Sequence, residues 1–249
     1  MKPIYEPKGK AKEYGDLAIN IYTGCPHRCF YCFAPNVLHK QREEFHTHVE
    51  PRQNIVEEVR KQVAKENITG KLIHLCFACD PYPKGYDSTP TREIIKILKA
   101  AGNHVQVLTK NGADAMRDFD LLDENDWFGI TYAGYSGLDY MKDYIPDEEP
   151  NAGSPHDRLY ALAVAHNKGI KTWVSAEPVL NTREVIDLIE SANYVNSWKI
   201  GKLNYYPSET DWGSFGAEVE HILTAKKRYC PDVDYYIKDS LRAEIDNRK

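Results

Sequence analysis

The sequence predicts an α/β protein built on a parallel sheet, and three observations support this prediction. Short apolar runs typical of strands alternate with amphipathic helical patterns about six times along the chain. Start and stop signals, such as Thr89-Pro90 and Gly102, bound the helical segments. The strand runs end in polar residues, as expected where ligands bind at the carboxyl edge of a parallel sheet. Repeated strand–helix units then form either an open doubly wound sheet or a curved, incomplete barrel.

The predicted strands are short, and each precedes a helical or loop segment. Cys25, Asp80, Lys110, Thr131 and Glu177 follow or end five of these runs. Because the carboxyl ends of parallel strands meet at one edge, we expect these side chains to share one face of the protein. The six strands are placed at residues 17–22, 72–77, 104–108, 128–132, 171–175 and 196–200.

The predicted helices follow the strands in order, and several begin at a capping residue. Asn54 and Asn181 are placed as N-caps, and Ser154-Pro155 opens a helix that Gly169 ends. The polar stretch Asp143–Ser154 is read as a long loop inside a domain. The other helices are expected between Thr89 and Gly102, over 113–123 and over 215–228.

The composition is that of a globular protein with no membrane span. The 249 residues are predicted to form a single domain, with a core at about 17–205 and a C-terminal helical or extended segment at 206–249. No apolar run is long enough to cross a bilayer. The net charge of −5 argues against coating nucleic acid by bulk electrostatics, but leaves room for a local basic cleft. Such a set of residues comprises Arg28, Lys40, Arg42, His46 and His48.

Three cysteines gather in one short segment. Cys25, Cys29 and Cys32 have the spacing C-x3-C-x2-C and lie beside Gly24 and Pro26. A loop that brings three thiolates together can hold a metal ion or an iron–sulfur cluster. A closed zinc site takes four ligands, as does an electron-transfer [4Fe–4S] cluster. Three cysteines would leave one iron of such a cluster open, so the cluster could take part in a reaction.

Disulfides, chance burial and zinc are the other interpretations of these cysteines. The chain begins Met1-Lys2-Pro3 without an apolar signal segment, which predicts a reducing, cytoplasmic location where disulfides are rare. Chance burial is a poor account of three cysteines so close together. Zinc is the main competitor, although no paired cysteine or histidine knuckle is present. The histidines nearby are His27, His39, His46 and His48.

The segment Gly24–Cys32 resembles the signature of the radical S-adenosylmethionine (SAM) superfamily. The chain is more narrowly similar to the spore photoproduct lyase-like branch, often labelled "DNA repair photolyase". This resemblance runs from about Ile19 to Asn204 and implies a partial (β/α)6 barrel of the TIM type. The Gly-Gly-Glu element of many radical SAM enzymes is absent. Supporting segments are Cys79–Pro83, Thr91-Arg92, Val107–Lys110, Arg117–Leu122, Ser154–Leu159 and Glu177–Val179.

The resemblance implies two cofactors and an external electron donor. A [4Fe–4S] cluster would be bound by Cys25, Cys29 and Cys32, and SAM would chelate the open iron. One electron, from a flavodoxin- or ferredoxin-like partner, would split SAM into methionine and a 5′-deoxyadenosyl radical. That radical would abstract hydrogen from the substrate, while the protein holds the chemistry in place.

The resemblance also assigns roles to residues at the strand ends. Lys110 would bind the methionine carboxylate of SAM, and Tyr31 would border the adenine. Asp80 would accept a hydrogen bond from the ammonium or ribose, Thr131 would bind the ribose or carboxylate, and Glu177 the ribose or substrate. Ordinary structural roles compete with these: ring packing for Tyr31, a turn for Asp80, and strand packing for Thr131.

A hydrogen-atom donor is a further implication of the resemblance. Spore photoproduct lyase uses a cysteine on its second strand for this purpose. Cys76 and Cys79 are both candidates by position, and Cys79 is the one we select. Alternation along a strand would place them on opposite faces, unless the strand has already ended. Buried, inert thiols are the competing interpretation.

Three functions follow, in decreasing order of support. The first is a radical SAM enzyme of lyase-like or modifying type that acts on a nucleic acid or a nucleotide lesion. The second is a radical SAM enzyme that modifies a peptide or a small metabolite. The third, outside enzymology, is a zinc-stabilised binding module.

Overall fold

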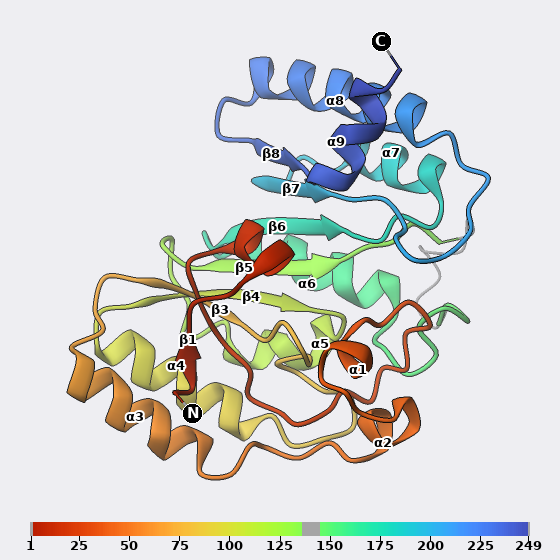
Figure 1. Cartoon of the computed structure of the whole chain (residues 1–249). Coiled ribbons are helices and arrows are strands. Elements are labelled where there is room, and N and C mark those ends of the chain that lie inside the picture. Colours follow the sequence, from red (N-terminus) through yellow and green to blue (C-terminus); the bar gives the residue numbers. More distant parts are fainter. Residues whose placement is uncertain (1, 136–144, 249) are drawn as a thin grey trace.

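An eight-stranded sheet organises the computed structural model, which describes residues 2–135 and 145–248 (Figure 1). The strands lie side by side in chain order. From β2 onward every neighbouring pair is parallel, and only β1 runs antiparallel to β2. The strands are β1 (Ile4–Tyr5), β2 (Leu17–Ile19), β3 (Leu72–Leu75), β4 (His104–Thr109), β5 (Trp127–Thr131), β6 (Lys171–Ala176), β7 (Ser197–Ile200) and β8 (Asp234–Ile237).

The sequential strand order decides between the two predicted architectures. A doubly wound sheet reverses its strand order at a switch point, which places helices on both faces. Here the order never reverses, so right-handed crossovers keep the helices on one face and the sheet curves into a partial barrel. In the described chain β1 and β8 form its two edges. The incomplete barrel is therefore confirmed, with β8 added by the segment after residue 205.

Helices cover the outer face of this sheet (Figure 1). The long ones each bury one apolar side against the strands. Two short helices follow the cysteine segment, and a 3-10 helix, η1, precedes β2. The bounds are η1 (Gly9–Tyr14), α1 (Ala34–Val37), α2 (Arg42–Thr47), α3 (Ile55–Glu66), α4 (Thr89–Ala100), α5 (Gly112–Ala115), η2 (Met116–Asp118), α6 (Pro155–Asn167), α7 (Thr182–Ser191), α8 (Trp212–Tyr229) and α9 (Asp239–Asp246).

The capping predictions are confirmed at two helices and wrong at a third. The Ser154 hydroxyl accepts a hydrogen bond from the Asp157 N–H at 3.1 Å, and Asn181 caps α7 in the same way. Asn54 does not cap α3, because its backbone is left-handed (φ 53°) and its side chain makes no capping bond. The helix expected over 113–123 is also shorter, since η2 ends at Asp118. Residues 143 and 144 of the predicted loop lie outside the described ranges.

The two faces of the sheet differ in polarity. Side chains on the helix-covered face are mostly aliphatic or aromatic and buried. The opposite, concave face carries His74 on β3, Gln106 on β4 and Ser175 on β6, three polar residues that are also buried. The Trp173 indole crosses this face and donates to the Val107 carbonyl at 2.9 Å. A polar concave face suits a ligand-binding interior better than a hydrophobic core.

His74 makes folding sensitive to acid. Its imidazole is 1% exposed, stacks on Phe77 at 4.1 Å between ring centroids, and has no hydrogen-bond partner at either nitrogen among the described residues. Burial, followed by the Lys199 cation, lowers the pKa of His74 to about 3. Below pH 6.5 the unfolded chain therefore binds a proton at His74, whereas the folded protein does not. The free energy of unfolding consequently falls as the pH falls.

We expect His74→Gln to blunt this loss. Between pH 6.5 and pH 5 the His74 contribution amounts to about 2 kcal/mol, from about 1.4 kcal/mol per pH unit. Urea unfolding at pH 7 and pH 5 measures it. The free energy of unfolding should drop less in the variant than in the wild type, and equal drops in both proteins would contradict the assignment.

Candidate active site

The three cysteines lie on the loop that follows β2, at the carboxyl edge of the sheet. Cys29 is buried, whereas Cys25 and Cys32 are partly exposed. The Cys25 N–H donates to the Phe45 carbonyl at 3.1 Å, which ties the start of the loop to α2. Gly24 is required there, because an added Cβ would collide with the Phe45 carbonyl oxygen and lie 2.7 Å from that of His48. These backbone contacts fix the start of the loop.

Arg42 and His46 hold the carbonyl groups of the loop. The Arg42 guanidinium donates to the carbonyls of Phe30 at 2.6 Å, of Cys32 at 3.2 Å and of Cys29. His46 Nδ1 lies 2.7 Å from the Cys25 carbonyl oxygen. With their carbonyls occupied in this way, the cysteines are left to present their sulfur atoms as ligands.

The three cysteine sulfurs are not gathered as closely as one tetrahedral ion requires. Around one tetrahedral zinc, sulfur atoms lie about 3.8 Å apart, given Zn–S bonds of about 2.3 Å. Within the described residues, the only group of three ligand atoms all within 4.8 Å of one another is that of His104, Asp123 and Asp126; the three cysteines form no such group. A cluster, whose irons are spaced apart, needs its thiolates further from one another than one ion does.

Electrostatics around the loop favour an anionic ligand. Burial raises the pKa of the Cys29 thiol to about 12, and the Lys110 and Arg158 cations oppose that rise. Burial also raises the pKa of Cys25 and of Cys32. Thiolates would therefore form on binding iron, and the two cations would offset their charge. Three thiolates with nearby cations form a donor set that fits a [4Fe–4S] cluster.

Asp80 joins three segments beneath the cysteine loop. One carboxylate oxygen accepts from the Tyr82 N–H at 2.8 Å and the Thr109 hydroxyl at 2.7 Å. The other accepts from the Lys110 N–H at 2.8 Å and lies 3.5 Å from His27 Nδ1. Burial raises the pKa of Asp80, and these donors oppose the rise. A contact between Asp80 and SAM would thus be shared with protein donors.

Lys110 and Tyr31 meet beside the cysteines. The Lys110 ammonium, which follows β4, lies 5.5 Å from the centroid of the Tyr31 ring. Gly153 donates to the Lys110 carbonyl at 2.8 Å, so the backbone of this lysine is held on both sides. The predicted cation is therefore next to the cysteine loop, half-buried and placed to bind an anionic group.

A buried charge network behind Tyr31 was not predicted. Glu149 and Arg158 are both fully buried and lie 2.5 Å apart. Glu149 also accepts from the hydroxyls of Tyr31 and, at 2.8 Å, of Tyr135. Arg158 donates further to the carbonyls of Gly153 and Thr131 and to the Tyr135 hydroxyl. The network couples the ring of Tyr31 to α6 and β5.

Thr131 and Glu177 lie further along the sheet edge. Thr131 ends β5, is buried, and pairs in register with Ser175 of β6. Glu177 follows β6, where its carboxylate accepts from the Tyr14 hydroxyl at 2.7 Å and contacts the Lys238 ammonium at 2.9 Å. The structure therefore gathers Tyr31, Asp80 and Lys110 at the cysteine loop, with Thr131 and Glu177 on the next two strands.

Cys79 points toward Cys76 rather than standing alone. β3 ends at Leu75, two residues earlier than predicted, so alternation does not separate the two thiols. The Tyr22 N–H donates to the Cys79 sulfur at 3.4 Å. Burial raises the pKa of Cys79, but hydrogen bonds from Cys76 and Tyr22 outweigh it and leave the pKa below its usual value. The role of hydrogen-atom donor stays a prediction.

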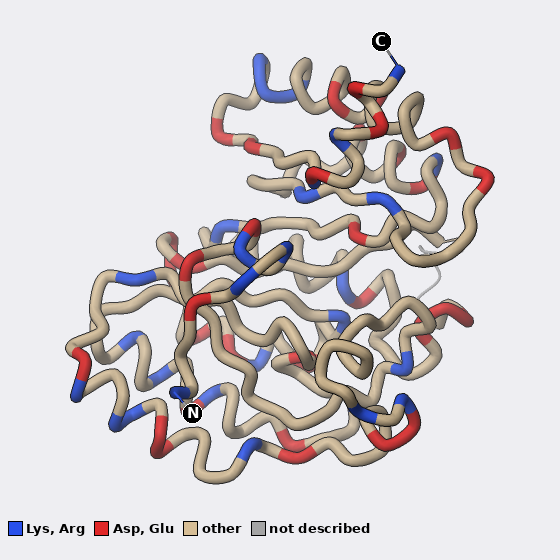
Figure 2. The backbone as a smooth tube through the Cα atoms, viewed as in Figure 1, with Lys and Arg blue, Asp and Glu red and all other residues tan. Residues whose placement is uncertain are grey.

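Acidic and basic residues are interspersed over the rest of the protein. Figure 2 shows acidic and basic residues mixed over the backbone. The basic set near the cysteines braces the loop: Arg28 pairs with Glu43 at 2.5 Å, and Lys40 donates to the Thr23 carbonyl. These contacts leave the set little freedom to bind phosphates.

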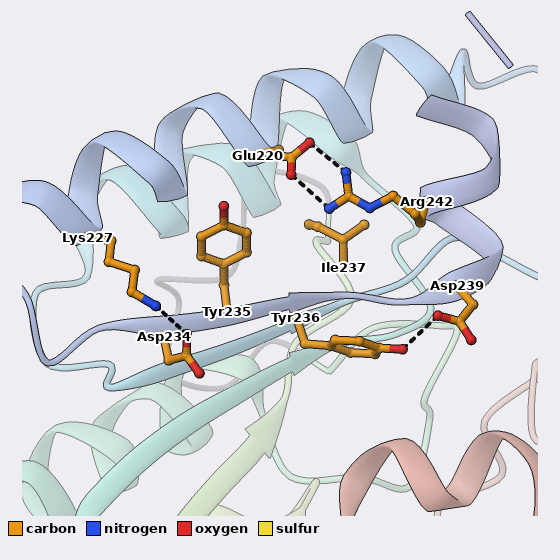
Figure 3. Close-up of a pocket in the computed structure, with 8 residues that line it drawn as sticks. All are labelled: Glu220, Lys227, Asp234, Tyr235, Tyr236, Ile237, Asp239 and Arg242. Atoms are coloured by element: carbon orange, nitrogen blue, oxygen red, sulfur yellow. Dashed lines mark hydrogen bonds and ion pairs between the residues drawn. The ribbon is translucent and has the colours of Figure 1, made fainter. Parts of the chain in front are cut away.

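A pocket of about 440 Å³ lies between β8 and helices α8 and α9 (Figure 3). Its charged groups pair with one another, as Lys227 does with Asp234 at 2.7 Å and Arg242 with Glu220 at 2.7 Å. β8 is the sheet edge opposite β1, whereas the cysteine loop follows β2. We therefore read this pocket as part of the packing of the C-terminal helices.

No helix among the described residues is both long and apolar enough to span a membrane.

The partial parallel barrel and the loop of three cysteines at its carboxyl edge are those expected of an enzyme that holds an iron–sulfur cluster. The profile of the Radical SAM superfamily matches residues 19–195. The chain belongs to the Radical SAM superfamily. Its cofactors are the [4Fe–4S] cluster and SAM that this family uses.

Sequence relatives carry no assigned activity. Uncharacterized protein ORF301 of Acidianus two-tailed virus is 30% identical over 193 residues, which cover 72% of this chain and 62% of that protein. The chain thus spans less than two thirds of that relative. Uncharacterized protein MJ0683 of Methanocaldococcus jannaschii is 26% identical, with 95% of this chain and 90% of that protein covered.

Solved structures share the fold at low sequence identity. Spore photoproduct lyase complexed with dinucleoside spore photoproduct matches with a TM-score of 0.66 and 14% identity, over 93% of this chain and 79% of that chain. Streptococcus suis SuiB bound to S-adenosylmethionine matches with a TM-score of 0.60 and 12% identity, over 88% and 49%. At these identities the likeness establishes the fold.

Proposed function

We propose that this radical SAM enzyme acts on a nucleic acid or nucleotide lesion. The cluster with SAM supplies a 5′-deoxyadenosyl radical that abstracts hydrogen from the substrate. The observation that supports the substrate class is the concave face, where the partly exposed Tyr14 and Phe77 have ring centroids 5.7 Å apart and the Lys199 ammonium lies 4.4 Å from the Tyr14 centroid. Aromatic rings can stack with bases, and cations can contact phosphates.

Each residue at the sheet edge has a place in this proposal. Cys25, Cys29 and Cys32 hold the cluster, and Lys110 binds the carboxylate of SAM. Tyr31 borders the adenine, with its ring fixed by Glu149. Thr131 and Glu177 then face the ribose or the substrate, and Asp80 orients Lys110 through its backbone N–H.

Anaerobic reconstitution with iron, sulfide, dithionite and SAM tests the chemistry. We expect bound iron and sulfide in equal amounts and the release of 5′-deoxyadenosine. Protein that binds one zinc and no sulfide would instead be the binding module. Replacing dithionite by a flavodoxin or ferredoxin tests the proposed electron donor, which must approach the cluster from the exposed side of the loop, near Phe30 and Phe33.

The substrate class is tested with dinucleoside spore photoproduct. Consumption of this probe by the reconstituted enzyme, observed only when SAM is present, supports the proposal. A steep fall of DNA binding with salt would be a second sign of phosphate contacts. An enzyme that cleaves SAM, does not consume the probe and binds no DNA would favour a peptide or a small metabolite as the substrate.

A further inference from the structure

The chain segment before β2 crosses the open side of the partial barrel. Ile4 and Tyr5 pair with β2 near one edge of the sheet, whereas η1 lies across the strands toward β6 (Figure 1). At the far end of η1 the Glu13 carbonyl accepts a hydrogen bond from the Lys199 ammonium at 2.8 Å. The Glu13 carboxylate lies 2.9 Å from the Lys238 ammonium. The segment therefore links the β2 edge to β7 and β8.

Tyr14 is the residue that this segment brings to the concave face. Its hydroxyl donates to the Glu177 carboxylate at 2.7 Å and lies 3.1 Å from the Ser175 hydroxyl. Lys238 and Lys199 place their ammonium groups 4.2 Å and 4.4 Å from the ring centroid. The ring contacts three others on this face: His74, Phe77 and Trp173.

The position of Tyr14 relates it to the cofactor site. Ser175 pairs in register with Thr131, so the Tyr14 hydroxyl lies one strand beyond the residue proposed to bind SAM. Both Glu177 and Lys238 follow the carboxyl ends of their strands, which is where ligands bind in such barrels. Tyr14 is partly exposed, unlike the fully buried Trp173 beside it.

A purely structural clasp would not require this chemistry. Desolvating two ammonium groups and two carboxylates costs stability, and apolar packing serves as well for joining two elements. Burial, followed by the Lys238 cation, lowers the pKa of Lys199 to about 8. This lowered pKa reflects the desolvation cost of the Lys199 ammonium. Charged groups kept at such a cost beside an active site point to a functional role.

We propose that Tyr14 is a positioning residue that closes the open side of the barrel and forms the wall of the substrate site opposite SAM. The phenol ring excludes other molecules from the radical, and the hydroxyl paired with Glu177 orients a planar, hydrogen-bonding group of the substrate, such as a nucleobase. This inference rests on the proposed radical chemistry.

The test uses an external hydrogen donor in place of the substrate. Reconstituted full-length enzyme is given SAM, dithionite and fully deuterated 2-propanol. The radical takes deuterium from the central carbon of the alcohol, which yields labelled 5′-deoxyadenosine and the ketyl radical of acetone. In the wild type the wall should exclude the alcohol, so little label is expected. Tyr14→Ala should raise the labelled fraction severalfold, with SAM affinity and cluster content unchanged.

Two variants separate this role from a general loss of structure. Tyr229→Ala removes an exposed tyrosine at the end of α8 and should leave the label at the wild-type level. Tyr14→Phe keeps the ring, so exclusion should persist, while loss of the hydroxyl should speed amide hydrogen exchange over residues 9–15. If Tyr14→Ala does not load a cluster, the exchange measured on Tyr14→Phe decides.

The outcomes are distinct. A wild type that forms no 5′-deoxyadenosine overturns both the proposed function and this inference. If the wild type and Tyr14→Ala form it with equal labelling, Tyr14 is not the wall and the inference alone is overturned. Unchanged hydrogen exchange over residues 9–15 in Tyr14→Phe would show that the Tyr14 hydroxyl does not hold this segment in place, and would likewise overturn the inference.

Discussion

Replacing Cys29 by alanine is expected to abolish both cluster binding and cleavage of SAM. Cys29 is the most buried of the three cysteines, at 6% exposure, and Arg42 and His46 fix the loop around it. Two thiolates cannot retain a [4Fe–4S] cluster with an open iron. Iron analysis, the absorbance of the cluster and the yield of 5′-deoxyadenosine should all fall to background.

Cys230 offers a matched control. It is an exposed, free cysteine that follows α8, far from the loop in sequence. Cys230→Ala should bind iron and cleave SAM as the wild type does. A Cys29→Ala variant that folds and still cleaves SAM would show that the cluster is held elsewhere.

Replacing Arg158 by methionine is expected to be the most destabilising change. The variant would leave Glu149 fully buried without its cation, and breaking a buried pair in this way costs about 3–5 kcal/mol. Burial raises the pKa of Glu149, and the Arg158 cation now opposes that rise. Without it the carboxyl should take up a proton, and Tyr31 should lose its anchor. Urea unfolding at neutral pH measures the loss of stability.

Arg183 provides the control for this prediction. It pairs with Asp187 at 2.9 Å on the exposed face of α7, and such a surface pair contributes about 0.3–0.5 kcal/mol. Arg183→Met should therefore unfold almost as the wild type does. Equal losses in the two variants would mean that the buried network does not stabilise the fold. The paired change of Arg158→Met with Glu149→Gln should recover part of the loss, because no charge then remains unpaired.

The local features of this fold are the ones that the sequence predicts well. All six expected strands exist, because a short apolar run bounded by turn residues is a local pattern. Ser154 and Asn181 were recognised as caps for the same reason. The cysteine loop was predicted from spacing alone, since three ligands in one segment need no distant partner.

Features that depend on distant partners were missed. Glu149 lies in a stretch with the pattern of an ordinary polar loop. It becomes a site residue through its contacts with Tyr31, 118 residues earlier, and with Arg158 on the next helix. Arg158 belongs to a segment of the family resemblance, which was the available signal. β8 and Tyr14 lie in end segments without a recognisable motif. Asn54 stands at the start of its helix, but its left-handed backbone (φ 53°) is not visible in the sequence pattern.

The link between Tyr14 and the last strands has a consequence for synthesis of the chain. Tyr14 leaves the ribosome 163 residues before Glu177, and Lys238 follows later still. The cysteine loop and the first strands can therefore form before Glu177 and Lys238, the partners of the segment before β2, have been synthesised. Iron and sulfide delivered at that stage would meet an open barrel, whereas in the completed chain Tyr14 is already hydrogen-bonded to Glu177.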